Sequence, residues 1–429
     1  MKFILSHIAF TGCLILFFPE AVFAYTGYTV RIMTYNLWNY GGESDIDNNR
    51  EDDLRLVIGK TGPDLLVVQE VENEMGYTRF LEDVLNHTEK DWEGASFKDQ
   101  PNTDYDIALF FKSEDFEMIS TDTVDITSNW GHRDAVEFMV KHSESNQEVI
   151  LYGVHFKAGS GEDDAADRES EATKLRKHLD DLDSTRHFFV LGDFNVYDGE
   201  EEGFQNLVDS LEDNDGRLFD PIDAIASWHN NMDYAKIHTQ ATRASYNGWN
   251  YGGMDDRFDF ILASKAVMDP GSVNIVADSY TAFGNDGTRC CNEAINAGNN
   301  SEVSSDVADA LYYASDHLPV YIDITFNAPD AALIKNILAP LPVTFELGQN
   351  FPNPFNATTI IPFSIYQESH TQLKIVNLSS QVVETVLDEK LAPGRYTVNW
   401  GSENFVSGLY FYTLESGGRS VTKKLILLK

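Results

Sequence analysis

Apolar runs and amphipathic segments alternate along the chain from Tyr28 to Phe326. Runs rich in β-branched and aromatic residues, bounded by polar or turn-forming residues, are typical of strands. On this basis we predict strands at TVRIMTYNL, DLLVVQEV, DIALFFK, AVEFMVKH, EVILYGVHF, HFFVLGDFN, RFDFILAS and HLPVYIDITF.

Four segments between these strands have helical character. They are Glu51–Lys60, Arg79–Asn86, Glu169–Leu182 and Phe204–Leu211. In the third, Ala172, Leu175, Leu179 and Leu182 recur at helical spacing and would form one apolar face. Many strands with a few interspersed helices indicate packed sheets that are covered by helices.

A different pattern begins after this α/β region. Residues 328–342 (APDAALIKNILAPLP) contain three prolines, which oppose regular structure, and are predicted to be a linker. Short apolar runs separated by turns follow, and their spacing predicts a small all-β, immunoglobulin-like sandwich over residues 343–429. A chain of 429 residues is too long for one ordinary core, so we expect the other domain to span residues 25–327.

The first 24 residues are organised like a secretory signal peptide. Lys2 supplies the positive charge, an apolar stretch continues through Phe18, and Val22-Phe23-Ala24 resembles a small-residue cleavage site. The apolar stretch is too short to span a membrane comfortably, and Pro19-Glu20 interrupts it. We therefore expect export, a mature chain beginning near Tyr25 and no stable membrane span.

Only Cys290 and Cys291 remain once this segment is removed. Adjacent cysteines cannot close a large loop, so the fold must depend on its hydrophobic core. A vicinal disulfide, an intermolecular bridge and two free thiols are all compatible with the sequence.

The formal net charge of −38 is unevenly distributed. From residue 343 onward seven acidic and seven basic residues balance, so the whole excess lies in the preceding part. An acidic surface repels polyanions at low salt and attracts divalent cations. It argues against a passive nucleic-acid-binding protein, which needs a basic footprint, but allows an enzyme that neutralises phosphate locally with a metal.

Carboxylates and amides stand at the ends of several predicted strands. Glu70 ends the apolar DLLVVQE, where a charge needs a partner such as a hard divalent cation, and Asn36 and Asp316 occupy comparable positions. Asp193 and Asn195, two residues apart after HFFVL, would face the same side and could position a water and a phosphoryl oxygen. Each of these residues, taken singly, is also compatible with a cap or a turn.

Two histidines also lie at the boundaries of predicted strands. His155 follows ILYGV, His317 precedes LPVYIDI, and Asp259 in RFDFIL is a candidate orienter, a combination typical of general acid–base chemistry. Arg133, just before AVEFMV, is a candidate phosphate clamp, with a solvated surface arginine as the alternative.

Other polar groups are assigned no chemistry. The acidic run Glu162–Asp167 is predicted to be a solvated loop, with a structural Ca²⁺ site as the alternative. The remaining histidines considered are predicted to be surface or packing residues: His87, His132, His178, His187, His229 and His238.

Six motifs between Tyr28 and about Phe326 resemble those of the endonuclease/exonuclease/phosphatase superfamily, and they occur in the family's order. They are TYNLW, QEVEN, YGVHFKAGSG, GDFNV, DRFDFIL and SDHLPV. One such motif is a weak signal, whereas six in order are highly specific. The resemblance implies a four-layer α/β sandwich with two packed central mixed β-sheets flanked by helices.

The same resemblance implies roles for individual residues. Glu70 would bind the catalytic metal, Mg²⁺ or alternatively Mn²⁺ or Ca²⁺, assisted by Asn36 and Asp316. Asp193 would orient or deprotonate the attacking water, and Asn195 would help to hold the phosphoryl group.

The remaining roles concern the histidines and the substrate. His317, oriented by Asp259, would stabilise the transition-state charge or supply a proton. His155 matches the second histidine of the deoxyribonuclease-like and sphingomyelinase-like branches, with Asp106 as a loosely aligned orienter, and Arg133 matches a phosphate-contacting arginine of the nuclease branch approximately.

The C-terminal segment, from about Phe345 to Lys429, resembles the sorting domain of the type IX secretion system. The resemblance rests on QNFPNPFNATT, PGRYTVNW, SGLYFYTL and KKLILLK. It implies that the secretion machinery is a partner and that the protein is secreted or attached to the cell surface.

We therefore expect a secreted, monomeric, metal-dependent phosphodiesterase, and specifically a nuclease that hydrolyses extracellular DNA or RNA. A phosphoesterase acting on lipid headgroups or other small phosphoesters is the alternative enzyme. A catalytically silent surface-binding protein is the alternative from another class. The complete set of ionisable residues argues against the silent protein.

Overall fold

The structure is a computed structural model. It describes residues 27–41, 50–88, 90–100, 103, 105–127, 132–211, 213–327, 334–335, 345–356, 358–379, 381–401 and 405–428. The predicted signal peptide, residues 1–24, and most of the predicted linker, residues 328–342, lie outside this part of the chain. None of the helices in the described ranges is both long and apolar enough to cross a membrane.

The first sheet has seven strands, in the order β13-β15-β1-β2-β4-β3 with β14 beside β15. Its strands are β1 (Tyr28–Tyr40), β2 (Leu65–Val71), β3 (Trp92–Gly94), β4 (Asp106–Lys112), β13 (Val273–Ile275), β14 (Thr281–Ala282) and β15 (Val320–Phe326). β2 is parallel to β1, and β15 is antiparallel to it. The ends of β1 and β2 and the start of β15 therefore lie at the same edge.

The second sheet has six strands, in the order β5-β6-β7-β8-β12-β9. They are β5 (Phe116–Val124), β6 (Ala135–His142), β7 (Glu148–His155), β8 (Phe188–Asp193), β9 (Leu218–Phe219) and β12 (Asp259–Ser264). β7 and β8 run parallel, and β12 is antiparallel to β8. Here too, the ends of two strands meet the start of a third.

The two sheets pack face to face over a core to which both contribute, including Ile32, Leu109, Leu151 and Ile261. Gly153 of β7 marks a close approach between them. A Cβ at this position would lie only 2.6 Å from Ile107 Cγ2 of the other sheet, so a larger residue would force the layers apart.

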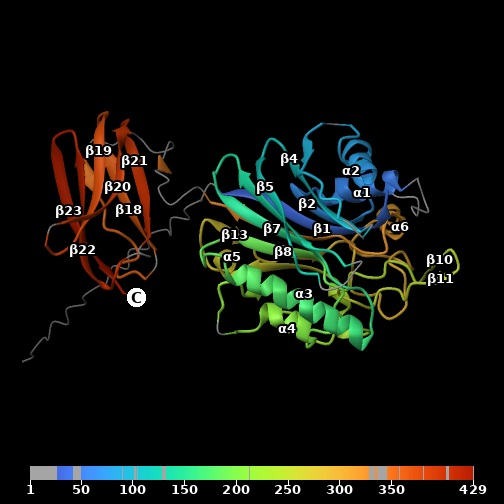
Figure 1. The fold of residues 1–429 in the computed structure, drawn as a ribbon. Coiled ribbons are helices and arrows are strands. Elements are labelled where there is room, and N and C mark those ends of the chain that lie inside the picture. The colour runs from blue at the N-terminus through green and yellow to red at the C-terminus, as the bar shows by residue number, and fades with distance from the viewer. Residues whose placement is uncertain are drawn as a thin grey trace, which may run out of the picture.

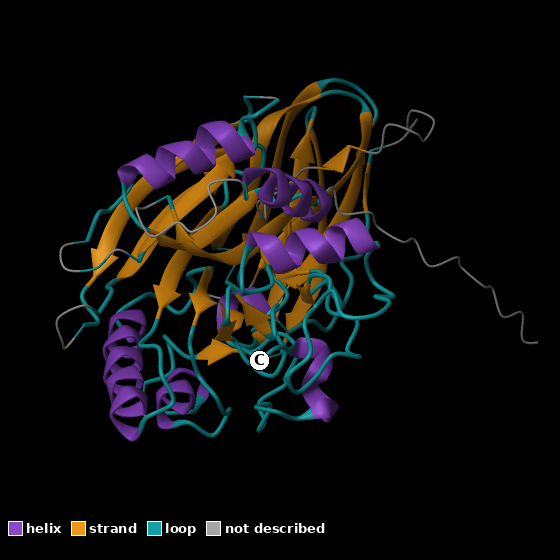
Figure 2. Cartoon of the chain, turned by 90° about the vertical axis from the view of Figure 1, so that its right-hand side faces the viewer, coloured by secondary structure: helices purple, strands orange, loops and turns teal. Residues whose placement is uncertain are grey.

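Helices cover the outer faces of both sheets (Figures 1 and 2). α1 (Glu51–Thr61), α2 (Glu74–Arg79), a π-helix over Phe80–Leu85 and α6 (Ser305–Ala314) lie on the first sheet, where they share a second apolar cluster with it. α3 (Glu162–Asp180) and α4 (Glu202–Val208) cover the second sheet over a third cluster. The predicted four-layer α/β architecture is confirmed.

Several helix limits differ from those predicted. The acidic run Glu162–Asp167 is not a loop but the beginning of α3, where its carboxylates lie at the positive end of the helix dipole. The predicted helix Arg79–Asn86 is the π-helix that continues α2, and α4 ends at Val208. α6 was not predicted, because its short apolar face follows a long irregular segment.

Irregular segments join the regular elements between β9 and β15. They contain a 3₁₀ helix over Met232–Ile237, the hairpin of β10 (Ser245–Tyr246) and β11 (Trp249–Asn250), and α5 (Lys265–Met268). Cys290 and Cys291 form a vicinal disulfide, one of the three states compatible with the sequence.

The C-terminal part is all-β. Two four-stranded sheets, in the orders β16-β21-β18-β17 and β20-β19-β22-β23, enclose a separate core that includes Ile361, Leu373, Trp400 and Tyr412. The strands are β16 (Ile334–Lys335), β17 (Glu346–Leu347), β18 (Thr358–Ile365), β19 (Ser369–Val376), β20 (Val382–Leu391), β21 (Gly394–Gly401), β22 (Gly408–Ser416) and β23 (Arg419–Leu427). The predicted all-β second unit is confirmed.

A buried ion pair ties the start of β12 to the segment after β9. Both Nη atoms of Arg257 donate to Asp220, at 2.8 and 2.9 Å, and both side chains are essentially inaccessible. Asp220→Ala would leave the guanidinium buried without its carboxylate, so we expect the free energy of unfolding to fall by about 3–5 kcal/mol in urea denaturation.

The matched control is Asp269→Ala, which removes an exposed partner of Lys265. Its expected effect is below about 1 kcal/mol, since exposed pairs contribute little. Equal effects of the two substitutions would show that the buried pair does not stabilise the fold in this way.

Candidate active site

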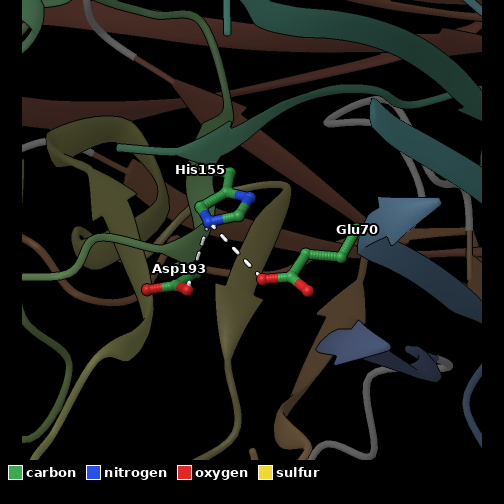
Figure 3. A group of neighbouring side chains, drawn as sticks. All are labelled: Glu70, His155 and Asp193. Carbon is green, nitrogen blue, oxygen red and sulfur yellow. Dashed lines mark ion pairs between the residues drawn. The ribbon is translucent and has the colours of Figure 1, made fainter. Parts of the chain in front are cut away.

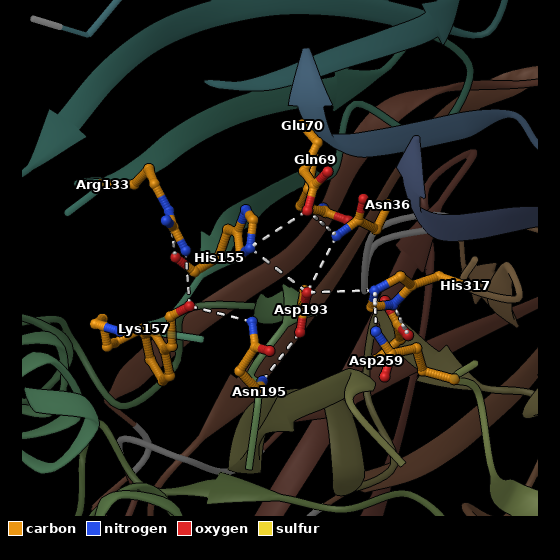
Figure 4. A network of polar contacts seen from close by, with 12 residues as sticks. Asn36, Gln69, Glu70, Arg133, His155, Lys157, Asp193, Asn195, Asp259 and His317 are labelled. Carbon is orange, nitrogen blue, oxygen red and sulfur yellow. Dashed lines mark hydrogen bonds and ion pairs between the residues drawn. The ribbon is translucent and has the colours of Figure 1, made fainter. Parts of the chain in front are cut away.

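Polar side chains from both sheets converge at the edge where these strand ends meet (Figure 4). His155 is the last residue of β7, Asp193 the last of β8 and Asp259 the first of β12, and the register places all three side by side. Asn36 of β1 and Glu70 of β2 approach from the other sheet. Residues that are distant in sequence thus form one cluster.

The backbone at Glu70 is unusual. Its φ is +60°, in the left-handed region that side-chain-bearing residues rarely adopt, and the pairing of β2 with β1 and β4 is interrupted around it. Its carboxylate accepts hydrogen bonds from Asn36 Nδ2 at 3.1 Å and from the backbone N of Asn39 at 2.9 Å. The strained turn and these bonds together fix the carboxylate at the edge of the cluster.

Asp193 is the centre of the network. Its Oδ2 accepts a hydrogen bond from Asn36 Nδ2 at 3.1 Å and lies 3.5 Å from His155 Nε2 and 3.7 Å from His317 Nε2. Its Oδ1 accepts a hydrogen bond from the backbone N of Asn195 at 3.0 Å. Burial raises the pKa of Asp193 to about 7. The Asp193 carboxylate therefore faces both histidines and binds a proton more readily than an exposed aspartate.

The two histidines differ in protonation. Burial opposes the charged form of His317, but the carboxylates of Asp259 and Asp193 hold its pKa well above the ordinary value. Its Nδ1 donates to Asp259 Oδ2 at 2.8 Å, which directs Nε2 into the site. Burial lowers the pKa of His155, and the charges of Arg133 and His317 lower it further. At neutral pH the site holds one imidazolium and one neutral imidazole.

One group in this site fits a divalent cation. Ligand atoms of Glu70, His155 and Asp193 all lie within 4.8 Å of one another (Figure 3). Burial and then the charge of Asp316 raise the pKa of Glu70. His155 Nδ1 is buried without a hydrogen-bond partner among the described residues. The buried carboxylate of Asp193 and the partly buried one of Glu70 form no ion pair with a lysine or arginine of the described residues, and next to a neutral imidazole they are chemically suited to a divalent ion.

This group shares only Glu70 with the predicted metal set of Asn36, Glu70 and Asp316. Asn36 instead bridges Glu70 and Asp193 through its amide nitrogen. Asp316 is buried beside His317 and acts on Glu70 through its charge, but belongs to no group of three ligand residues in the described ranges.

Arg133 is buried, in contrast to the surface alternative. Its Nε donates to the carbonyl of His155 at 3.0 Å, and its Nη2 donates to that of Phe156 at 2.8 Å. Asn195 Nδ2 donates to the same Phe156 carbonyl at 3.2 Å. Nη1 of Arg133 has no hydrogen-bond partner among the described residues, so one donor of the guanidinium is available.

Asp106 lies at the start of β4 and is buried. Its Oδ1 accepts a hydrogen bond from the backbone N of Gln100 at 3.1 Å. Between the described side chains of Asp106 and His155 no hydrogen bond is formed, so the orienting role of Asp106 stays a prediction.

Sequence reasoning missed three residues that support this site. Glu171 accepts a hydrogen bond from the backbone N of Lys157, and Arg168 donates to the carbonyls of Lys157 and Gly159, so both hold the segment after His155. Arg168 lies four residues before Ala172 on the apolar face of α3, and an arginine on that face was a usable signal. Gln240, whose amide lies 3.2 Å from His317 Nε2, stands in no recognisable motif.

Two family models match the chain. Residues 33–317 match the model of the Endonuclease/Exonuclease/phosphatase family, and residues 349–428 match that of the Secretion system C-terminal sorting domain. No curated protein matches the chain.

Solved structures resemble the chain over its larger part. The human Nocturnin catalytic domain with bound sulfate has a TM-score of 0.46 and 18% identity, covering 70% of this chain and 95% of that one. D. rerio TDP2 complexed with single-strand DNA product has a TM-score of 0.47 and 15% identity, covering 69% and 98%. A mannosyl-6-phosphatase of Bacteroides thetaiotaomicron has a TM-score of 0.45 and 16% identity, covering 69% and 99%.

The C-terminal match identifies a type IX sorting domain, which implies export. The family model spans about two thirds of the chain, from β1 to the edge of β15, and includes the whole cluster around Asp193. The chain belongs to the endonuclease/exonuclease/phosphatase family, whose members are phosphoester hydrolases.

Proposed function

We propose that the protein is a secreted, divalent-metal-dependent phosphodiesterase that hydrolyses extracellular DNA or RNA. The observation that carries this proposal is the position of Asp193, whose Oδ2 lies within 4 Å of both a neutral and a protonated histidine. Such a site offers a proton acceptor and a proton donor on either side of one reacting centre.

Glu70, Asp193 and His155 would hold the ion, and Asn36 would keep the first two carboxylates in place. A divalent ion held there would polarise the phosphoryl group and stabilise its developing negative charge. Asp193 would orient the attacking water beside the ion and accept its proton.

His317 would carry out the other proton transfer of the reaction. Because it is protonated and oriented by Asp259, its Nε2 can donate to a phosphoryl oxygen or to the departing alkoxide. Asn195 and Arg133 both donate to the carbonyl of Phe156, the residue that follows β7. From there the Asn195 amide and the available Nη1 of Arg133 can hold the non-reacting phosphate oxygens.

The choice of nucleic acid rests on where the protein acts. A sorting domain directs the chain out of the cell, where DNA and RNA are abundant phosphodiesters. The proposed signal peptide at residues 1–24 would carry it across the inner membrane. The site itself requires only a phosphodiester, so small phosphoesters and lipid headgroups are the other outcomes of the test.

We expect hydrolysis of plasmid DNA or RNA with Mg²⁺ or Mn²⁺, and its loss with EDTA. His155→Gln should lower kcat/KM by about 10²–10⁴-fold, the range for loss of a group at the reacting centre. His187→Gln is the control, since His187 precedes the opposite end of β8. Preferred hydrolysis of sphingomyelin or a sugar phosphate would replace nucleic acid as the substrate, and no hydrolysis at all would favour a binding protein.

The pH dependence should follow His317. Its proton is present below its raised pKa and is lost as the pH increases, so the rate should fall on the alkaline side. Asp259→Asn removes a carboxylate that holds this pKa up, and should move the alkaline limb of the pH–rate profile to lower pH. The exposed Asp269→Asn should leave the limb in place. An unmoved limb in Asp259→Asn would remove His317 as the proton donor.

The net charge of −38 should affect long substrates. Added NaCl screens the repulsion between the acidic surface and a polyanion, so cleavage of long DNA should first increase up to roughly 0.1 M salt and then decline. Bis(p-nitrophenyl) phosphate, which carries one charge, should show no such increase. A steady decline from the lowest salt concentration with DNA would contradict this expectation.

A further inference from the structure

We propose a second divalent-cation site, formed by His229, Asp255 and Asp256 and distinct from the group at Glu70. Ligand atoms of these three residues all lie within 4.8 Å of one another. His229 was predicted to be a surface or packing residue, Asp255 stands in no motif used above, and Asp256 opens the DRFDFIL motif but was assigned no role there.

The three side chains converge from two segments of the chain. His229 Nδ1 lies 2.7 Å from Asp256 Oδ1, and the side-chain amide of Asn230 lies 2.7 Å from His229 Nε2, which keeps Nδ1 directed at the aspartates. Asp256 is 4% exposed. The carboxylate of the half-buried Asp255 has no hydrogen-bond partner among the described residues.

This cluster carries uncompensated negative charge. In the described part of the chain no lysine or arginine forms an ion pair with Asp255 or Asp256, and His229 is the only group that opposes their charge. A divalent cation between the two would stabilise both ionised carboxylates at once.

The backbone of the cluster is already fixed. The backbone N atoms of Asp255 and Asp256 both donate to the carbonyl of Gln240 at 3.0 Å. The carbonyl of Asp255 accepts from Asn230 N at 2.9 Å, and that of Asp256 accepts from Thr239 N at 2.7 Å. An ion would therefore enter a preformed arrangement and would need little reorganisation of the main chain.

The site is separate from the first but connected to it. Gln240 forms bridges with Asp256 and with His317, so these two residues lie on opposite sides of it, about 10 Å apart at two strand spacings. The two groups of ligands share no residue, so this ion would be separate from the one at Glu70. It would instead brace Gln240, whose amide contacts His317.

The donor set indicates which ion would bind. One imidazole nitrogen and two carboxylates, with an open side toward solvent at His229, suit Zn²⁺ or Mn²⁺ better than Mg²⁺, which prefers oxygen ligands and keeps its waters. We assign the site to a transition-metal ion of this class.

The test is a zinc count on the full-length protein. The chain is stripped with EDTA, reloaded with Zn²⁺, passed through a desalting column and assayed for zinc per chain by atomic emission. His229→Gln should bind about one zinc ion fewer than the wild type, because the site would lose its nitrogen ligand. The His229 side chain is 46% exposed, so the substitution should leave the fold intact, which circular dichroism checks.

Two further variants make the result specific. His370 forms an exposed pair with Asp388 at 3.3 Å, and no third ligand joins them among the described residues, so His370→Gln should leave the zinc count unchanged. Glu70→Gln should retain the ion at His229, so adding His229→Gln to it should again remove one ion. An equal zinc content in the wild type and His229→Gln would overturn the proposal, whether or not the protein proves to be a nuclease.

Discussion

The candidate site depends on the register between β7, β8 and β12. This register places His155, Asp193 and Asp259 side by side at the end of one sheet, and the packing of the second sheet brings Asn36 and Glu70 against them. A shift by one residue would turn each of these side chains to the opposite face. The close contact at Gly153, in the same strand as His155, is one of the packing constraints that holds the layers in this relation.

Much of the site was predictable because strand ends have a local signature. A polar residue that follows an apolar run must leave the core, and several such residues at one edge of packed sheets must meet. Glu70, His155 and Asp193 follow this rule because each lies at or next to the end of an apolar strand, and Asp259 follows it at the start of its strand. The layered fold was predictable for the same reason, since the apolar runs identified eight strands of the two sheets; β3, β5, β9, β13 and β14 were not predicted.

The contacts that the sequence did not predict lie mostly in irregular segments, where no periodicity indicates which residues meet. Gln240 reaches His317 across 77 positions, and Asp255 and Asp256 reach His229 only because three loop segments share backbone hydrogen bonds. The group Glu70, His155 and Asp193 was likewise not predicted as a metal-binding set, although each of its residues was a candidate. Which carboxylates approach one imidazole depends on the side-chain directions set by the bulge at Glu70, and these are not encoded in residue spacing.

The left-handed backbone at Glu70 bears on how such an enzyme could be engineered. Glycine or asparagine adopts that conformation with less strain than glutamate, so a stability screen without an activity assay would tend to select them at position 70. Such variants would tolerate heat better while losing the carboxylate that faces Asp193 and His155. At position 70 stability favours glycine or asparagine, whereas catalysis requires the carboxylate, and the natural chain has the residue with the more strained backbone.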